Sequence, residues 1–266
     1  MLNLLVICLI VYLLSTRCRS GHPGMKDLLG WSYAHRGLHG GGIPENSMAA
    51  FRAALEGGYG IELDVHLLKD GNLAVIHDSL LSRTTGLPGR VEDLTTEDLR
   101  NCHLAGTAET IPEFMDVLTL FHGKAPMIIE LKSVDGNHAA LAEAACKMLE
   151  TYRGVFCMES FDPRCLIWLK RRRPDIIRGQ LAENSLRGGN GLPGYLNFLL
   201  THCMGNFLCV PDFIAYKFSD RNSTVSTGIC RRLWKAQGVA WTLRTREDYD
   251  TAKKEGWLPI FEGFRP

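Results

Sequence analysis

Charged residues stand two apart in two apolar segments of this 266-residue chain. The run Gly60–Val65 contains Glu62 and Asp64, and a later apolar run contains Glu130 followed by Lys132. In an extended strand, side chains two residues apart lie on the same face. Carboxylates that share one face of an apolar strand repel each other, so they need a cation, a proton or a positively charged partner.

Two kinds of site meet this need. Three carboxylates without a cysteine suit a hard divalent cation such as Mg²⁺ or Ca²⁺, which prefers oxygen ligands. Alternatively, Lys132 neutralises the acids in a salt-bridge layer inside the fold, since buried charges are usually paired. The spacing alone leaves both interpretations open.

A predicted β-hairpin adds a histidine to the acidic residues. Asp70-Gly71 is a strong signal for a two-residue turn, and so short a connection makes the flanking strands antiparallel. If Lys69 opposes Asn72, then Asp64 opposes His77, with their Cβ atoms roughly 5 Å apart. The carboxylates would favour the imidazolium form of His77, which would then serve as an acid or base. A one-residue bulge would change this register.

Another polar motif, His35-Arg36-Gly37, ends the first strand-like apolar run after the linker. The planar fork of an arginine donates two hydrogen bonds to a phosphate, although a loop salt bridge is the alternative explanation for Arg36. All these polar groups lie where predicted strands end. Active sites of (β/α)₈ barrels form at the carboxyl ends of their strands.

Short apolar runs alternate with longer amphipathic runs, which is typical of parallel strands joined by helices. One helix is predicted over Ser47–Glu56, after an Asn46 cap. The hairpin strand Leu73–His77 stands outside the series, and eight strands remain. We therefore predict an α/β fold, a (β/α)₈ TIM barrel with a hairpin-containing insertion at about residues 70–110, after the second strand. The eight strands are Ser32–His35, Gly60–Val65, Met127–Leu131, Val155–Ser160, Ile177–Leu181, Phe213–Phe218, Val239–Leu243 and Pro259–Phe261.

The composition excludes several classes of protein. The chain has 30 basic and 29 acidic residues, a net charge of +1 that gives no reason to expect a nucleic-acid partner. Apolar residues make up 45% and charged residues 22%, as in ordinary globular proteins. The nine cysteines are odd in number and contain no Cys-x-x-Cys motif, so they indicate a reducing compartment, not a disulfide framework or zinc site.

The N-terminus is apolar from Leu2 to Leu14, and basic residues follow it at Arg17, Arg19 and Lys26. We predict a short uncleaved membrane anchor over residues 1–16, a linker over 17–30 and a barrel domain over 31–266, with the barrel in the cytoplasm by the positive-inside rule. The alternative is a cleaved signal peptide and a secreted protein. The segment Leu192–Val210 is also unusually apolar. It is expected to be a packed barrel helix, or else a segment that enters the membrane interface.

Taken together, the motifs resemble those of the glycerophosphodiester phosphodiesterases. The resemblance covers about residues 31–262. It rests on His35-Arg36-Gly37, Pro44-Glu45-Asn46-Ser47, Ala50-Phe51, Glu62-Leu63-Asp64-Val65, Asp70-Gly71, His77-Asp78, Ser82-Arg83-Thr84-Thr85, Ile111-Pro112, Glu130-Leu131-Lys132, Glu159-Ser160-Phe161 and Trp241-Thr242.

The resemblance implies a phosphodiesterase that acts on small or lipid-derived phosphodiesters with one divalent cation. The implied metal ligands are Glu62, Asp64 and Glu130, and the implied acid–base pair is His35 and His77. The implied roles around the substrate are phosphoryl binding by Arg36, added positive charge from Lys132, orientation of His35 or a water by Glu45, and an apolar wall for glycerol from Trp241. Core packing is the alternative role of Trp241.

Two residues depart from the family pattern. The last strand continues into Glu262 instead of the family's Thr-Asp or Thr-Asn, and Lys217 lies on a barrel strand. A salt bridge between the two at the barrel rim would account for both. Three alternative functions stay open: a membrane-associated lysophospholipase D, a catalytically silent phosphodiester- or lipid-binding module, and a glycosidase that uses the barrel carboxylates.

Overall fold

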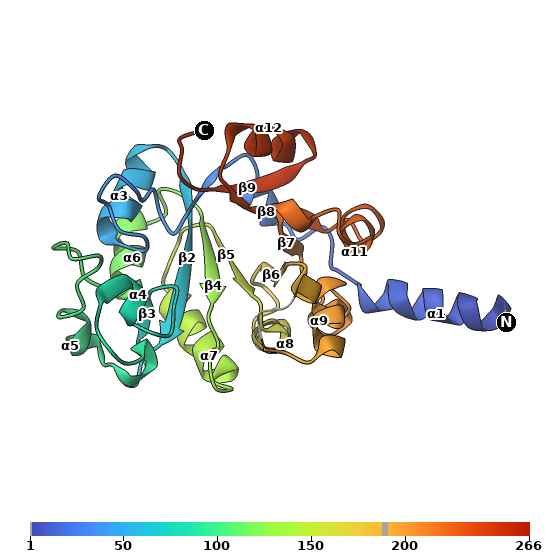
Figure 1. Cartoon of the computed structure of the whole chain (residues 1–266), viewed down its shortest axis with the longest axis horizontal. Coiled ribbons are helices and arrows are strands. Elements are labelled where there is room, and N and C mark those ends of the chain that lie inside the picture. Colours follow the sequence, from blue (N-terminus) through green and yellow to red (C-terminus); the bar gives the residue numbers. More distant parts are fainter. Residues whose placement is uncertain (1, 188–190) are drawn as a thin grey trace.

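The computed structural model of the chain describes residues 2–187 and 191–266. Within these residues, eight parallel strands pair in sequence and the last pairs with the first, which closes a barrel (Figure 1). Each predicted strand overlaps one of them, so the predicted (β/α)₈ TIM barrel is confirmed. The barrel strands are β1 (Tyr33–His35), β2 (Gly60–Leu67), β4 (Met127–Leu131), β5 (Phe156–Ser160), β6 (Arg178–Ala182), β7 (Phe213–Lys217), β8 (Gln237–Leu243) and β9 (Trp257–Phe261).

Helices connect the strands and cover the outside of the barrel. The α-helices are α1 (Leu2–Ser15), α2 (Met25–Leu28), α3 (Met48–Glu56), α4 (Ser82–Thr85), α5 (Thr96–Leu99), α6 (Phe114–Phe121), α7 (His138–Leu149), α8 (Pro163–Arg172), α9 (Gly194–Thr201), α10 (Asn206–Cys209), α11 (Ser226–Gly228) and α12 (Arg246–Lys254). Three 3₁₀ turns and one π-helical turn complete the described helical elements: η1 (Val91–Asp93), η2 (Ser185–Arg187), η3 (Phe218–Asp220) and the π-helical η4 (Ile229–Leu233).

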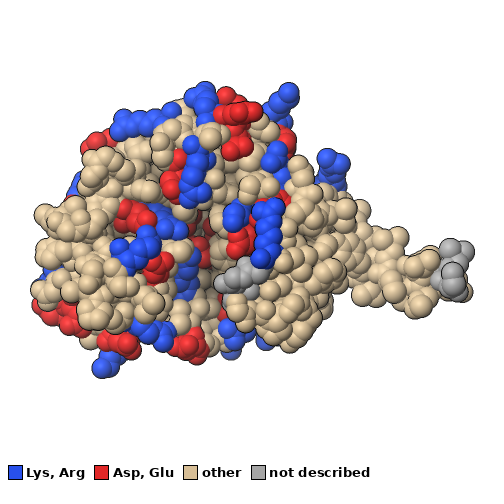
Figure 2. Space-filling model, viewed as in Figure 1, with Lys and Arg blue, Asp and Glu red and all other residues tan. Residues whose placement is uncertain are grey.

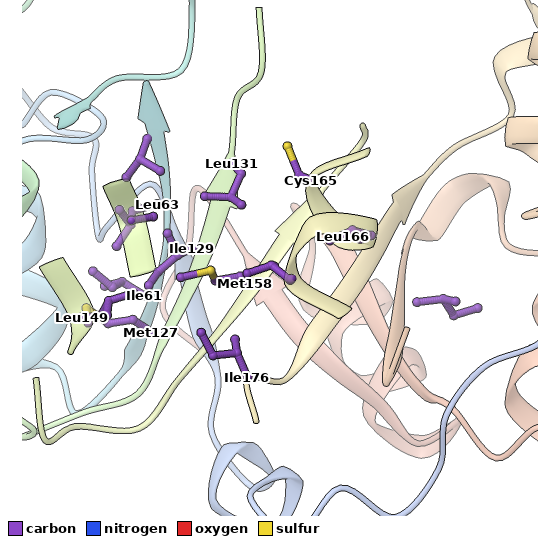
Figure 3. Close-up of a cluster of buried hydrophobic side chains, with 14 of the residues drawn as sticks. Ile61, Leu63, Met127, Ile129, Leu131, Leu149, Met158, Cys165, Leu166 and Ile176 are labelled. Atoms are coloured by element: carbon purple, nitrogen blue, oxygen red, sulfur yellow. The ribbon is translucent and has the colours of Figure 1, made fainter. Parts of the chain in front are cut away.

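Alternate residues of each strand face opposite sides of the barrel wall. Ile61 and Ile129 belong to the outer core between strands and helices (Figure 3), whereas Tyr33 and Ile128 belong to the apolar cluster inside the barrel. The same alternation determines which polar side chains point into the barrel. Glu130 lies two residues after the inward-facing Ile128, so it also faces inward, at the carboxyl end of the barrel.

The helix cap before α3 lies one residue later than predicted. The Ser47 hydroxyl accepts a hydrogen bond from the Ala50 backbone N–H at 3.1 Å, so Ser47 is the cap. Asn46 is instead buried and donates from Nδ2 to Asp64 Oδ2 at 2.8 Å. A residue predicted to cap a helix thus helps to hold a carboxylate in place.

The predicted hairpin forms, but its register is wrong by one residue. The strand β3 (Leu73–Val75) pairs antiparallel with β2, and Val65 lies opposite Val75. Gly71 adopts a φ of +87°, and the turn around it is one residue longer than a two-residue turn. Asp64 therefore does not oppose His77, which follows the end of β3.

The insertion after the hairpin is held against the barrel by a buried polar contact. His66 Nδ1 on β2 lies 2.7 Å from Glu92 Oε1 on η1, and the Ser79 hydroxyl donates to the same carboxylate at 2.7 Å. Burial would raise the pKa of Glu92, but these hydrogen bonds lower it to about 2. The insertion also has its own small apolar core.

The helix α1 is attached to the barrel only near its C-terminal end and projects from the body past α9 and α11 (Figure 1). The Tyr12 hydroxyl lies 2.6 Å from Ser226 Oγ, and the Trp234 indole N–H donates to the Leu13 carbonyl at 3.2 Å. Among the described residues, no helix combines the length and apolarity needed to cross a membrane.

Gly179 on β6 offers a test of barrel packing. A Cβ atom there would lie 1.9 Å from the ring of Phe213, a buried side chain on β7. We expect Gly179→Ala to lower the free energy of unfolding by about 1–3 kcal/mol, because the ring cannot move without disturbing the interior. Gly228→Ala is the matched control, since a Cβ there meets no described atom within 4 Å. Indistinguishable urea denaturation curves for the two variants would contradict this account of the packing.

Candidate active site

Three carboxylates cluster at the carboxyl end of the barrel. Glu62 and Asp64 on β2 and Glu130 on β4 each offer an oxygen atom, and these atoms lie within 4.8 Å of one another. The strand register produces the cluster, because it places Asp64 beside Glu130. All three side chains are buried. The structure therefore brings together the acids that the strand spacing singled out.

Burial acts on the charges of this cluster. It is the main cause that raises the pKa of Glu62 well above its usual range and that of Glu130 to about 7. Burial opposes ionisation of Asp64 as well, but Lys132 and His77 hold the pKa of Asp64 well below its usual range.

Lys132 provides part of the charge compensation. Its Nζ lies 2.8 Å from Glu130 Oε1 and 3.1 Å from Asp64 Oδ1, so the salt-bridge layer considered from the sequence exists. One ammonium group is not enough for three buried carboxylates, and two of them carry raised pKa values. The cluster, with only oxygen donors, therefore fits a hard divalent cation in addition to Lys132.

A fourth carboxylate, Glu159 on β5, lies beside Glu130 in the parallel register. Its side chain is buried, burial raises its pKa well above the usual range, and its Oε2 has no hydrogen-bond partner in the described part of the chain. Sequence reasoning gave Glu159 no role. The sequence did contain a signal for this residue. Glu159 follows the inward-facing Cys157 by two residues, just as Glu130 follows the inward-facing Ile128 by two residues.

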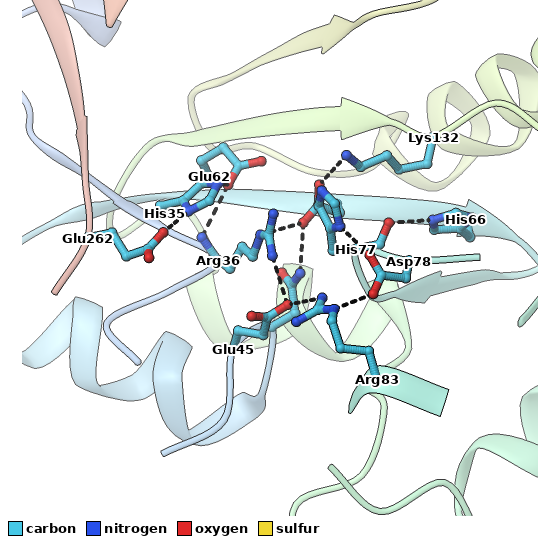
Figure 4. A network of polar contacts seen from close by, with 12 residues as sticks. His35, Arg36, Glu45, Glu62, His66, His77, Asp78, Arg83, Lys132 and Glu262 are labelled. Atoms are coloured by element: carbon cyan, nitrogen blue, oxygen red, sulfur yellow. Dashed lines mark hydrogen bonds and ion pairs between the residues drawn. The ribbon is translucent and has the colours of Figure 1, made fainter. Parts of the chain in front are cut away.

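Two histidines at the mouth of the barrel each contact a carboxylate through Nδ1 (Figure 4). His35 Nδ1 lies 2.5 Å from Glu262 Oε2, and His77 Nδ1 lies 2.6 Å from Asp78 Oδ1. Nε2 of each ring forms no hydrogen bond in the described part of the chain, and His35 Nε2 lies 3.9 Å from Glu62 Oε2. Burial lowers the pKa of both histidines, although the carboxylates oppose the shift. The expected preference of His77 for the imidazolium form is therefore wrong, because desolvation outweighs its acidic neighbours.

Arg36 is held at the mouth by acidic residues on either side. Its Nη1 donates to Glu45 Oε1 at 2.8 Å, and its Nε lies 3.5 Å from Asp64 Oδ2. Arg83 Nη2 also donates to Glu45 Oε1, at 2.6 Å. In this structure Glu45 contacts the two arginines, whereas the carboxylate that contacts His35 is Glu262 (Figure 4).

The two departures from the family pattern do not pair with each other. Lys217 Nζ lies 2.9 Å from Glu183 Oε2, and Arg244 Nε donates to Glu262 Oε1 at 3.1 Å. The expected salt bridge between Lys217 and Glu262 is therefore wrong. The contacts with His35 and Arg244 lower the pKa of Glu262 to about 2, although burial opposes the shift.

A cavity of about 450 Å³ opens above the carboxylates, in the hollow flanked by charged side chains in Figure 2. Trp241 forms part of its wall, with its ring 5.6 Å from that of Phe161 and its indole N–H donating to the Ala215 carbonyl at 2.9 Å. Trp241 is only partly buried, so it faces the cavity as well as the core. The predicted residues that line the cavity are His35, Arg36, Glu62, His77, Glu130, Lys132 and Trp241, together with Glu159 and Lys217.

Comparisons with known proteins agree on one family. A glycerophosphodiester phosphodiesterase of Bacillus altitudinis is 41% identical over 130 residues, which cover 46% of this chain and 53% of that protein, so the matched part spans about half of the relative's length. One of Caldanaerobacter subterraneus is 36% identical over 173 residues, 61% of this chain and 69% of that protein.

A solved structure shares the fold. The Oleispira antarctica phosphodiesterase in complex with the product sn-glycerol-3-phosphate aligns with a TM-score of 0.74 and 21% identity, over 93% of this chain and 96% of that one. The model of the glycerophosphoryl diester phosphodiesterase family matches residues 35–188, which contain seven of the nine lining residues named above. The chain therefore belongs to the glycerophosphoryl diester phosphodiesterase family, a family of phosphoric diester hydrolases.

Proposed function

We propose that this protein hydrolyses glycerophosphodiesters to glycerol 3-phosphate and an alcohol, using one divalent cation, Mg²⁺ or Ca²⁺. The observation that carries the proposal is the joint arrangement of three clustered carboxylates and two carboxylate-bound histidines around one cavity. The structure of the Oleispira antarctica enzyme contains the product sn-glycerol-3-phosphate, which is the phosphate product that we propose here.

His35 and His77 supply the acid–base chemistry in this proposal. Their lowered pKa values keep a neutral ring available, so one histidine accepts the proton of the attacking water or glycerol hydroxyl. A new P–O bond then forms and the bond to the alcohol breaks. The other histidine, which must enter this step as the imidazolium with a proton on Nε2, delivers that proton to the leaving oxygen, and a glycerol nucleophile would require a second hydrolytic step that opens a cyclic phosphate.

Positively charged groups stabilise the phosphoryl oxygens. Arg36 binds them through its guanidinium, and Lys132 adds charge at the base of the cavity. A divalent cation held by Glu62, Asp64 and Glu130 would offset the charge that develops on these oxygens. Trp241 offers an apolar surface for the glycerol.

For location, we propose that residues 1–16 anchor the chain in a membrane and that the barrel is cytoplasmic. All nine cysteines are free, which agrees with a reducing compartment. Most of the described apolar side chains of α1 are exposed, as an anchor requires: Leu4, Leu5, Val6, Ile7, Leu9, Ile10, Val11 and Leu14.

Removal of divalent cations tests the metal site. We expect EDTA to abolish turnover of glycerophosphocholine and added Mg²⁺ or Ca²⁺ to restore it. Glu62→Gln, Asp64→Asn and Glu130→Gln should each lower the metal content of the purified protein, because each removes a charged oxygen ligand. Glu143→Gln on the exposed side of α7 is the control. Full activity in EDTA, or cleavage of glycosides in place of phosphodiesters, would contradict the proposal.

Substitution of the histidines tests the acid–base assignment. His35→Ala and His77→Ala should each lower kcat by roughly 10²–10⁴-fold while substrate binding stays measurable, since general acid–base catalysis contributes about that much. His103→Ala, at an exposed position in the insertion, is the matched control. If the wild-type protein binds glycerophosphodiesters without turnover, the chain is a silent binding module instead.

A second candidate substrate is a lysophospholipid, because η2, which follows β6 at the mouth, packs against the apolar helix α9. Turnover of glycerophosphocholine and of lysophosphatidylcholine separates the two. We expect the soluble diester to be cleaved, because the cavity of about 450 Å³ has room for its polar groups. Cleavage of the lysolipid alone would identify a lysophospholipase D and overturn the leading proposal.

A further inference from the structure

We propose that α9, α10 and the exposed faces of α1 form one surface that docks on a lipid bilayer containing anionic lipids. The inference extends the anchoring proposed for residues 1–16 to a surface of the barrel itself. It does not depend on the catalytic assignments.

Two stretches of the sequence that lack charged side chains contribute to the surface. Residues 1–16 and 191–211 contain no Asp, Glu, Lys or Arg. Large apolar side chains in the second stretch are exposed. They are Leu192, Tyr195, Phe198, Leu199, Phe207 and Leu208, with exposed fractions from 37% for Leu199 to 68% for Tyr195. Exposed apolar side chains in such number, without intervening charge, mark an interaction surface.

The two stretches are continuous in space. The Tyr12 hydroxyl on α1 lies 3.1 Å from Nδ1 of His202, the cap residue that directly follows α9. The ring of His202 lies 4.3 Å from that of Phe198 on α9. Figure 2 shows the same continuity, with uncharged residues along α1 and over the adjoining flank of the barrel.

The shape of α1 identifies the occupant as lipid. A helix that docks in a protein groove needs one apolar face, whereas apolar side chains are exposed at consecutive positions of α1, including Leu4, Leu5, Val6 and Ile7. A helix that is apolar all round suits surroundings that are apolar on every side, such as the hydrocarbon of a bilayer. With a rise of about 1.5 Å per residue, α1 is roughly 21 Å long, so it reaches well into the hydrocarbon.

Basic residues at the base of α1 add charge complementarity. Arg17 follows α1, and Arg232 and Lys235 flank Trp234, whose indole contacts Leu13 and Thr16 at the helix end. The side chains of Arg17, Arg232 and Lys235 form no ion pair with an acid in the described part of the chain, and all three residues are exposed. Cations where an apolar helix leaves the membrane match the negative headgroups of anionic lipids.

The surface also borders the mouth of the barrel. Leu181 on β6 lines the catalytic cavity, and η2, which follows that strand, packs against α9. A bilayer in contact with α9 would therefore lie beside one rim of the mouth.

Vesicle binding by the full chain tests the proposal. We expect co-sedimentation with phosphatidylcholine vesicles and tighter binding when phosphatidylglycerol is included. The double variant Phe198→Glu/Phe207→Glu should weaken partitioning by roughly tenfold or more, because it replaces exposed apolar area with charge. Met115→Glu, at an exposed apolar position on α6, is the matched control and should bind like the wild type.

The basic residues are tested separately. Arg17→Glu/Arg232→Glu/Lys235→Glu should abolish the preference for phosphatidylglycerol, and Lys69→Glu at the hairpin tip should not. Circular dichroism checks that each variant folds. If the Phe198→Glu/Phe207→Glu variant partitions into vesicles as the wild type does, the proposal is overturned. It is also overturned if the wild-type protein self-associates without vesicles and this variant does not, because the surface then binds a second copy of the chain. Turnover of glycerophosphocholine without vesicles reports on the catalytic proposal alone.

Discussion

The confinement of carboxylates inside the barrel is the constraint on which the rest of the site depends. An isolated buried charge is costly, and its cost falls only when opposite charge lies close by. The strands must therefore deliver cations to the same place as the acids. Lys132 follows Glu130 by two residues on the same strand face, and Arg36 enters from the end of β1. The buried acids of the site are Glu62, Asp64, Glu130 and Glu159, so these two fixed cations cannot balance all four carboxylates when they are ionised.

Barrel closure determines which groups meet the acids. Because β9 pairs with β1, the end of the last strand lies beside the end of the first, and Glu262 reaches His35 across 227 positions of sequence. The hairpin after β2 returns the chain to the mouth and places His77 near Asp64 by a local route. Two unrelated connections thus produce the same arrangement, a histidine whose Nδ1 contacts a carboxylate.

The sequence predicted features that repeat along the chain better than contacts that depend on exact register. Alternation of apolar runs identified all eight barrel strands, and the two-residue spacing placed Glu62 and Asp64 on one face. The pairing of Asp64 with His77 failed because one extra turn residue shifts a register completely. The partner of Glu262 was unpredictable from local patterns, since its contacts with His35 and Arg244 arise only when the barrel closes.

The near-balance of charge in the whole chain conceals a strong separation within it. Acids and bases meet at the mouth, where each buried carboxylate requires compensation, while the stretches 1–16 and 191–211 carry none. A flank without charge has no such requirement and exposes apolar side chains instead. Because η2 joins the strand β6 at the mouth to α9 on this flank, polar chemistry and an apolar surface lie next to each other without sharing a side chain.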